Sequence, residues 1–181
     1  MIVSVISTCS EKLSEREFVD PIVNIVENYT VTNTVNYFHY TNLDQSSILD
    51  SDRIIICGTS LQDKDYLDKL EIFQFILSSK IPTLGICSGF QIISLLGGCN
   101  VVNNREIGMI EVSTLSDNRL CNGNFQAFSL HNFSVSENSK LKILATSTQA
   151  PQIIKIVNLS MYGVSFHPEV RNEEIISNFL D

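Results

Sequence analysis

The chain has 181 residues, 44% of them hydrophobic, with 12 basic and 20 acidic side chains and a formal net charge of −8. This length and apolar content predict one domain with a full core. The acidic balance argues against nucleic acid as a partner, because such binding needs clustered Lys and Arg, and no apolar run approaches the ~18 residues of a membrane span.

The first half of the chain alternates predicted strands and helices. Apolar and β-branched runs predict strands over residues 1–7, 31–40, 53–58 and 82–86. The sequence Ser14-Glu15-Arg16-Glu17 has the pattern of a capping box and predicts a helix that continues to about Asn28. A second helix is expected over residues 65–79 from the apolar residues Leu67, Leu70, Phe73, Ile76 and Leu77. This alternation predicts a parallel sheet whose functional groups gather at the carboxyl ends of its strands.

The second half is predicted to be rich in strands. We expect them over residues 109–115, 125–130, 141–148, 153–158 and 162–166, joined by short turns and followed by a helix over 172–180. No linker divides the chain. The sequence therefore predicts a single α/β domain over residues 1–181, with a central, mostly parallel sheet flanked by helices and an antiparallel extension.

The cysteines favour a reduced, intracellular protein. The five residues are odd in number and form no CxxC pair, so we expect neither a disulfide framework nor a metal site: Cys9, Cys57, Cys87, Cys99 and Cys121. The N-terminus lacks the pattern of a signal peptide, and a cytoplasmic location is expected.

The segment Gly85-Ile86-Cys87-Ser88-Gly89-Phe90-Gln91 lies between an apolar strand and an apolar helix. A nucleophile between two glycines at a sharp strand-to-helix turn is typical of a nucleophile elbow. The glycines are expected because a Cβ at either position would strike the neighbouring strand or helix. The thiol would lie at a helix N-terminus, which favours a thiolate.

A cysteine nucleophile needs a base, and the chain has three histidines: His39, His131 and His167. His167 is the strongest candidate because it follows an apolar strand in the sequence Phe166-His167-Pro168-Glu169. In an extended chain His167 and Glu169 point to the same side, so Glu169 is predicted to hold the imidazole and stabilise the imidazolium.

A GxCxGxQ elbow followed much later by a strand and His-Pro-Glu resembles the class I (triad) glutamine amidotransferases over nearly the whole chain. The resemblance implies their flavodoxin-like fold. It also implies that Cys87 attacks the side-chain amide of glutamine, that His167 and Glu169 complete the triad, and that the products are glutamate and ammonia. The family passes this ammonia to a synthetase site in another domain or subunit.

The resemblance extends to residues that hold the substrate and the oxyanion. It implies oxyanion donors at the backbone N–H groups of Ser88 and Gly58, with Gln91 matching the motif. His131 and Phe133 align with the stretch that packs beside bound glutamine. The chain departs from the family in three places: Cys57-Gly58-Thr59-Ser60 replaces an SGGP turn, Ser88 is smaller than usual, and Phe90 stands where His or Met is common.

The form His167-Pro168-Glu169-Val170 resembles that of GMP synthetases. The resemblance implies a separate amidotransferase subunit that supplies ammonia for GMP synthesis from XMP, with an ATP-pyrophosphatase synthetase subunit for its partner. ATP and Mg²⁺ are expected only on that partner, and no cofactor on this chain. Three alternatives stay open: an amidotransferase subunit of the anthranilate or aminobenzoate type, a γ-glutamyl hydrolase or peptidase of the same fold, and a non-catalytic binding protein.

Overall fold

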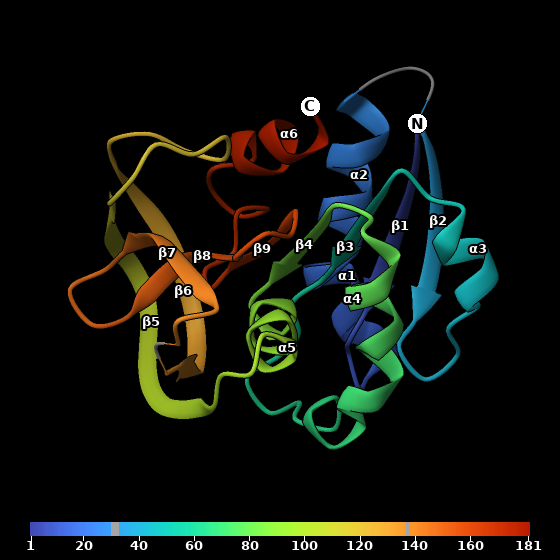
Figure 1. Ribbon diagram of the computed structural model, residues 1–181, viewed down its shortest axis with the longest axis horizontal. Coiled ribbons are helices and arrows are strands. Elements are labelled where there is room, and N and C mark those ends of the chain that lie inside the picture. Colours follow the sequence, from blue (N-terminus) through green and yellow to red (C-terminus); the bar gives the residue numbers. More distant parts are fainter. Residues whose placement is uncertain (30–32, 137) are drawn as a thin grey trace.

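The structure, a computed structural model, describes residues 1–29, 33–136 and 138–181. These residues form a nine-stranded sheet in the order β2-β1-β3-β4-β9-β8-β7-β5-β6 (Figure 1). The parallel half consists of β1 (Ile2–Ser7), β2 (Thr34–His39), β3 (Arg53–Ile56), β4 (Thr83–Ile86) and β9 (Met161–Val164). The antiparallel half consists of β5 (Val101–Thr114), β6 (Asn124–Val135), β7 (Leu141–Thr146) and β8 (Pro151–Ile156). The predicted fold class is confirmed.

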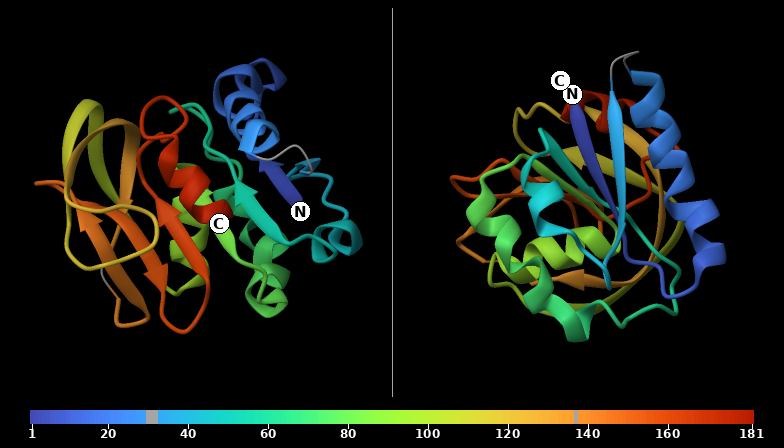
Figure 2. Two further views of the ribbon diagram at one scale, coloured as in Figure 1. Left: turned by 90° about the horizontal axis from the view of Figure 1, so that it is seen from above. Right: turned by 90° about the vertical axis from the view of Figure 1, so that its right-hand side faces the viewer.

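Helices cover both faces of the parallel strands, and Figure 2 shows α2 and α5 on opposite sides of them. One layer contains α1 (Glu15–Phe18), α2 (Asp20–Tyr29) and α6 (Glu174–Leu180). The other contains α3 (Gln45–Leu49), α4 (Gln74–Ser79) and α5 (Ser88–Leu96). In β3 the alternation is direct, since Ile55 packs into the first layer whereas Ile54 and Ile56 pack into the second. This explains the continuous apolar run of that strand.

The predicted capping box at Ser14 is wrong. A 3₁₀ turn over Lys12–Ser14 precedes α1, so Ser14 has helical angles (φ −65°, ψ −22°) and its side chain makes no capping hydrogen bond. The predicted single helix is also divided, because α1 ends at Phe18 and α2 begins at Asp20. Pro21 falls in the first turn of α2, where its missing N–H breaks no helical hydrogen bond.

The helix predicted over 65–79 is a 3₁₀ helix (Leu67–Phe73) followed by the short α4. Its apolar residues Leu67, Leu70 and Phe73 recur every third position, which is the period of a 3₁₀ helix rather than of an α-helix. Lys69 has non-helical angles (φ −125°, ψ 29°) and marks a kink inside the segment. The apolar spacing therefore located the element correctly and assigned the wrong helix type.

Strands β5 and β6 are longer than predicted, and α3 was not predicted. The first part of β5 lies mostly at the surface, so its residues show no apolar alternation that would reveal a strand. Helix α3 has only five residues and begins where the Asp44 carboxylate accepts hydrogen bonds from Ser46 N and Ser47 N. The strand predicted from residue 31 begins at Thr34 in the structure, and residues 31–32 lie outside the described ranges.

Within the described ranges, no helix is long and apolar enough to cross a membrane.

Candidate active site

The strand order changes direction at β1, which lies between β2 and β3. Ligands of open α/β sheets bind outside the carboxyl ends of the strands at such a switch point. Thr8 follows β1 there, Cys57 and Gly58 follow β3, and Cys87 follows β4. The topology therefore brings these short segments to one edge of the sheet.

Cys87 is a strained residue between β4 and α5. Its backbone has φ 51° and ψ −100°, a region that costs a non-glycine residue about 1–3 kcal/mol. The flanking glycines permit this turn, as the sequence predicts. A Cβ on Gly85 would lie 2.2 Å from the carbonyl oxygen of Gly89, and a Cβ on Gly89 would lie 2.3 Å from that of Ile56. At the elbow the backbones of β4, α5 and β3 lie in direct contact, and only glycine leaves room for this at positions 85 and 89.

His167 and Glu169 form a buried pair, in which Nδ1 of His167 lies 2.7 Å from Oε1 of Glu169. The extended geometry predicted for them is wrong, because β9 ends at Val164 and residues 168–170 form a turn closed by Val170 N to His167 O. The ring is held from two further sides. The His167 backbone N–H donates to Phe128 O at 2.9 Å, and the Phe18 ring packs against the imidazole with centroids 5.4 Å apart.

The surroundings of His167 favour an imidazolium. Burial alone would lower the pKa of His167, but the hydrogen bonds and electrostatic interactions with Cys87 and Glu169 outweigh burial and raise this pKa to about 10. The other ring nitrogen, Nε2, is buried without a hydrogen-bond partner among the described residues. A Cβ added to Gly58 would lie 2.8 Å from Cε1 of His167 and 3.2 Å from Cβ of Cys87, so these two side chains meet across Gly58.

A small cavity lies beside Cys87, with a volume of about 20 Å³. Four of the predicted substrate or oxyanion residues line it, namely Ser88, Gln91, His131 and Phe133. Thr59 and Ser60 of the turn after Gly58, and Leu130 and Asn132 beside His131, also line it, as do three residues that no local pattern singles out: Leu61, Asp63 and Tyr66. The cavity has room for about one water molecule, so an amino acid can enter only if a lining segment moves.

The segment over residues 59–66 closes this cavity through contacts with β6 and α5. Lys64 Nζ lies 5.0 Å from the centroid of the Phe133 ring, and Asn132 Nδ2 lies 3.5 Å from Leu61 O. Tyr66 donates its hydroxyl hydrogen to Gln91 Oε1 at 2.8 Å. Tyr66 is only 3% exposed, so the segment is held at its buried end as well as by contacts nearer the surface.

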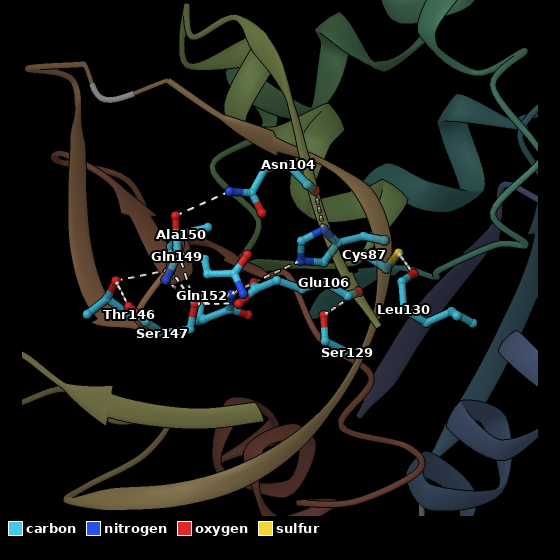
Figure 3. A network of polar contacts seen from close by, with 11 residues as sticks. Cys87, Asn104, Glu106, Ser129, Leu130, Thr146, Ser147, Gln149, Ala150 and Gln152 are labelled. Atoms are coloured by element: carbon cyan, nitrogen blue, oxygen red, sulfur yellow. Dashed lines mark hydrogen bonds and ion pairs between the residues drawn. The ribbon is translucent and has the colours of Figure 1, made fainter. Parts of the chain in front are cut away.

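His131 belongs to a buried network that the sequence did not reveal. Its Nδ1 donates to Asn104 O at 3.1 Å, and its Nε2 lies 3.4 Å from Oε2 of Glu106. Figure 3 shows that the Glu106 carboxylate also accepts hydrogen bonds from Ser147 and Gln152, at 2.7 and 2.6 Å. Because both ring nitrogens of His131 face acceptors, this ring is fixed as part of the cavity wall.

Glu106 lies just after a register shift between β5 and β6, which turns its side chain into the protein. The only local signal for a buried Glu106 would have been an acidic residue inside a predicted strand. That signal was missing because residues 101–108 were not predicted as a strand. Figure 3 also shows Cys87 Sγ against the Leu130 carbonyl, at 3.7 Å. Strand β6 therefore contributes both Leu130 and His131 to the wall around the thiol.

Phe90 does not line the cavity. Its side chain is buried in the layer formed by α4 and α5, where a Cβ on Gly163 would lie 2.8 Å from its ring. The departure from the family at this position is thus a matter of core packing. Within the described ranges, no group of three or more His, Cys, Asp or Glu side chains could hold a metal ion.

The family described as "Glutamine amidotransferase class-I" matches residues 14–181 of the chain. A protein of Ignicoccus hospitalis, named as a glutamine-hydrolyzing GMP synthase subunit, is 32% identical over 136 residues, covering 68% of this chain and 71% of that protein. The protein of the same name from Sulfolobus acidocaldarius is 32% identical over 142 residues, covering 71% of this chain and 75% of that one.

Solved structures show the same fold. A protein from Thermoplasma acidophilum, whose name also refers to one subunit of GMP synthase, superposes with a TM-score of 0.85 at 21% identity, covering 99% of this chain and 92% of that one. The glutaminase domain of CTPS from Trypanosoma brucei, with bound acivicin, has a TM-score of 0.76 at 13% identity over the same shares. At these identities the likeness establishes the fold alone.

Proposed function

Because the chain belongs to the class I glutamine amidotransferase family, we propose that it hydrolyses glutamine to glutamate and ammonia at Cys87, with His167 and Glu169 completing the triad. The observation that supports this most is the buried His167–Glu169 pair, which meets the strained Cys87 across Gly58. A nucleophile, a base and a group that orients the base are the elements of a catalytic triad.

The geometry suggests a two-step reaction. His167 takes the proton of the Cys87 thiol, and Sγ attacks the side-chain amide carbon of glutamine. The carbonyl oxygen becomes an oxyanion that accepts from the N–H groups of Gly58 and Ser88. His167 Nε2 then donates its proton to the leaving nitrogen, which departs as ammonia and leaves a glutamyl thioester. His167 next removes a proton from water, whose oxygen attacks the thioester, so that glutamate leaves and the thiol is restored. Glu169 holds Nδ1–H throughout.

Four residues around the cavity are proposed to position the substrate: Gln91, His131 and Phe133 at its wall, and Ser88 at the elbow. The ring of His131 cannot act as the base in this proposal, because both of its nitrogens already face acceptors, Asn104 O and the Glu106 carboxylate. His167 differs in that Glu169 is bonded at Nδ1 alone, and the other group that raises the pKa of the ring is Cys87. This contrast supports His167 as the base.

The acceptor of the ammonia is proposed from the relatives' names. Two proteins named as glutamine-hydrolyzing GMP synthase subunits match 68% and 71% of this chain, which supports a partner that is a separate synthetase subunit and XMP as the acceptor. The synthetase would carry the ATP and Mg²⁺. The cavity of about 20 Å³ is too small for glutamine, so in this proposal it opens when the synthetase subunit docks. Such coupling would keep the protein from releasing ammonia when no acceptor site is present.

Glutamate release tests the proposal. The wild type, Cys87→Ala and the control Cys121→Ser are each assayed alone and with the candidate synthetase subunit, ATP, Mg²⁺ and XMP. Cys121 is a suitable control because its thiol is partly exposed and does not line the cavity. We expect release by the wild type and the control to rise with the synthetase, and Cys87→Ala to release none in either setting.

Equal release by the wild type and Cys87→Ala in both settings would refute the proposal. Cleavage of γ-glutamyl peptides without any partner would instead indicate a γ-glutamyl hydrolase. Glutamate release could rise with an anthranilate or aminobenzoate synthase partner but not with the GMP-forming synthetase and XMP. That result would show a different ammonia acceptor and would leave the proposed glutaminase activity unchanged.

A further inference from the structure

Three oxygen atoms meet in the protein interior behind the catalytic cysteine. The Thr8 and Ser88 hydroxyl oxygens are 2.7 Å apart, and they lie 3.2 and 3.0 Å from the carbonyl oxygen of Cys57. All three residues are at most 1% exposed. They come from the end of β1, the elbow and the end of β3, so this cluster joins the three segments that form the switch point.

At least one hydroxyl must donate to the Cys57 carbonyl. Each hydroxyl has a single hydrogen, and the 2.7 Å contact between them needs one of the two. The hydroxyl whose hydrogen is not used in that contact has Cys57 O as its acceptor. The distances favour a chain in which Thr8 donates to Ser88 and Ser88 donates to Cys57 O at 3.0 Å. In a buried site such a chain of hydrogen bonds is mutually strengthening.

Fixing this carbonyl also fixes the next N–H. The described residues contain no cis peptide, and in a trans peptide the C=O of Cys57 and the N–H of Gly58 point in opposite directions. The hydroxyls therefore direct the Gly58 N–H away from themselves. Gly58 is buried, and its N–H has no acceptor among the described residues. A buried N–H without a partner is rare in proteins and requires an explanation.

We propose that Thr8 and Ser88 are positioning residues, whose hydroxyls fix the Cys57–Gly58 peptide so that the Gly58 N–H is ready to donate to the oxyanion formed at Cys87. This rests on the proposed glutaminase function. It also explains how the turn Gly58-Thr59-Ser60 works without the second glycine and the proline of the family's usual turn. The small Ser88, another departure from the family, supplies the hydroxyl in place of a bulky side chain.

The test separates an effect on the oxyanion from a general loss of structure. Thr8→Val, Ser88→Ala and the double variant are compared with two matched controls, Ser4→Ala in β1 and Ser94→Ala in α5. Both controls remove a fully buried, hydrogen-bonded hydroxyl that does not contact Cys57. For each protein, kcat and KM for glutamate release are measured with the synthetase present, and alkylation of Cys87 by iodoacetamide is timed in parallel.

Alkylation is the discriminating readout because the thiol displaces iodide at a saturated carbon and no oxyanion forms. We expect kcat to fall about 10–100-fold in Ser88→Ala and Thr8→Val, with KM and the alkylation rate within about twofold of the wild type. The double variant should be little worse than the worse single variant, since both act through one peptide. Thr8→Ser, which keeps the hydroxyl, should retain most of the activity.

Wild-type kcat in both single variants would overturn the inference, and so would an equal loss in Ser94→Ala. A parallel loss of alkylation and kcat would also overturn it, because the hydroxyls would then be needed only for packing. An active wild type with unaffected variants leaves the proposed function standing. A wild type that releases no glutamate with its synthetase refutes the proposed function and this inference together.

Discussion

At the scale of single residues, backbone strain and buried charge meet at Cys87. The positive φ of Cys87 lifts its side chain above the sheet, and His167 lies behind it with a pKa raised to about 10 against the effect of burial. Part of that rise comes from Glu169, which is 7% exposed and bonds Nδ1 of the ring. Removing the charge of Glu169 should therefore change how His167 titrates.

We predict that Glu169→Gln lowers kcat for glutamate release by about 10²–10⁴-fold, because the imidazolium loses its stabilising carboxylate and its fixed orientation. The pKa of His167 should fall, so the alkaline limb of the pH–rate profile, near pH 10 in the wild type, should move to lower pH. Profiles measured from pH 6 to 10.5 check both effects. Glu173→Gln changes an exposed carboxylate slightly later in the chain, and as the control it should behave like the wild type. Identical profiles for both variants would contradict the role of Glu169.

The raised pKa of His167 also makes the folded protein less stable at high pH. The folded-state pKa of His167 lies above its ordinary value of 6.5, so the folded protein binds this proton more tightly than the unfolded chain. The resulting stabilisation is complete below about pH 6.5 and is lost as the pH rises toward 10.

The residues of the proposed triad could be singled out in the sequence because each lies in a short local pattern, a Gly-Cys-Gly elbow and a His-Pro-Glu sequence. Their geometry could not, since the turn at residues 168–170 depends on the contacts of His167 with Phe128 and Phe18. Thr8 and Glu106 were missed for a related reason. Their partners are distant in sequence, so no local pattern marks either residue.

At the scale of elements, the β5–β6 ribbon connects the cavity with the antiparallel half of the sheet. Its two strands pair over most of their length, with one register shift beside Glu106. The Glu106 carboxylate is 3% exposed and joins β5 to Ser147 and to Gln152 of β8. Burial alone would raise the pKa of Glu106, but the hydrogen bonds from His131, Ser147 and Gln152 outweigh burial and lower it.

We predict that Glu106→Gln lowers the free energy of unfolding at pH 7 by about 1–3 kcal/mol, because its partners lose a charged acceptor. A depressed pKa stabilises the folded state above the ordinary value of 4.5 and ceases to do so as the pH falls through the folded value. In urea unfolding at pH 7 and at pH 3, the difference between variant and wild type should therefore be smaller at pH 3, with the change confined to pH values below 4.5. Glu111→Gln, exposed on the same strand, should differ little from the wild type at either pH. A Glu106→Gln deficit that grows in acid would contradict this account.

The elbow depends on close contact between α5 and β3, and we predict that Gly89→Ala removes about 2 kcal/mol or more of unfolding free energy. Its Cβ would lie 2.3 Å from the Ile56 carbonyl oxygen, a backbone atom that cannot rotate away. Gly97→Ala is the control, because Gly97 has φ −72° and its nearest neighbour is the flexible Leu141 side chain at 3.0 Å. Denaturant unfolding of the two variants should give clearly different midpoints, and similar midpoints would disprove the steric explanation.

Elements were predictable where burial gives them a pattern. The parallel strands were located within a few residues, and the continuous apolar run of β3 is the clearest example. Strand β5 was predicted too short because much of its first part is exposed, whereas the missed end of β6 is buried or half-buried. In the segment over Leu67–Phe73, apolar residues at every third position accompany a 3₁₀ helix inside a longer amphipathic stretch.

At the scale of the whole molecule, the end of the chain completes the site. Strand β9 enters the sheet between β4 and β8, and this brings His167 and Glu169 beside Cys87. Strand β6 supplies the opposite wall of the cavity. The sequence predicted two sheet halves, but no pattern within it states that β9 pairs with β4. In the structure β9 pairs with β4 in parallel, and its Tyr162 and Val164 are buried against the helices of the first layer.

The central claim is that Cys87 is the residue that becomes acylated by glutamine. Its most direct test is peptide mapping by mass spectrometry after the protein, with its synthetase partner present, reacts with the glutamine-like electrophile acivicin. We predict one adduct per chain, on Cys87, whose formation excess glutamine slows and which is absent from Cys87→Ala. An unmodified Cys87, or an adduct on another cysteine at the same rate in Cys87→Ala, would contradict the account.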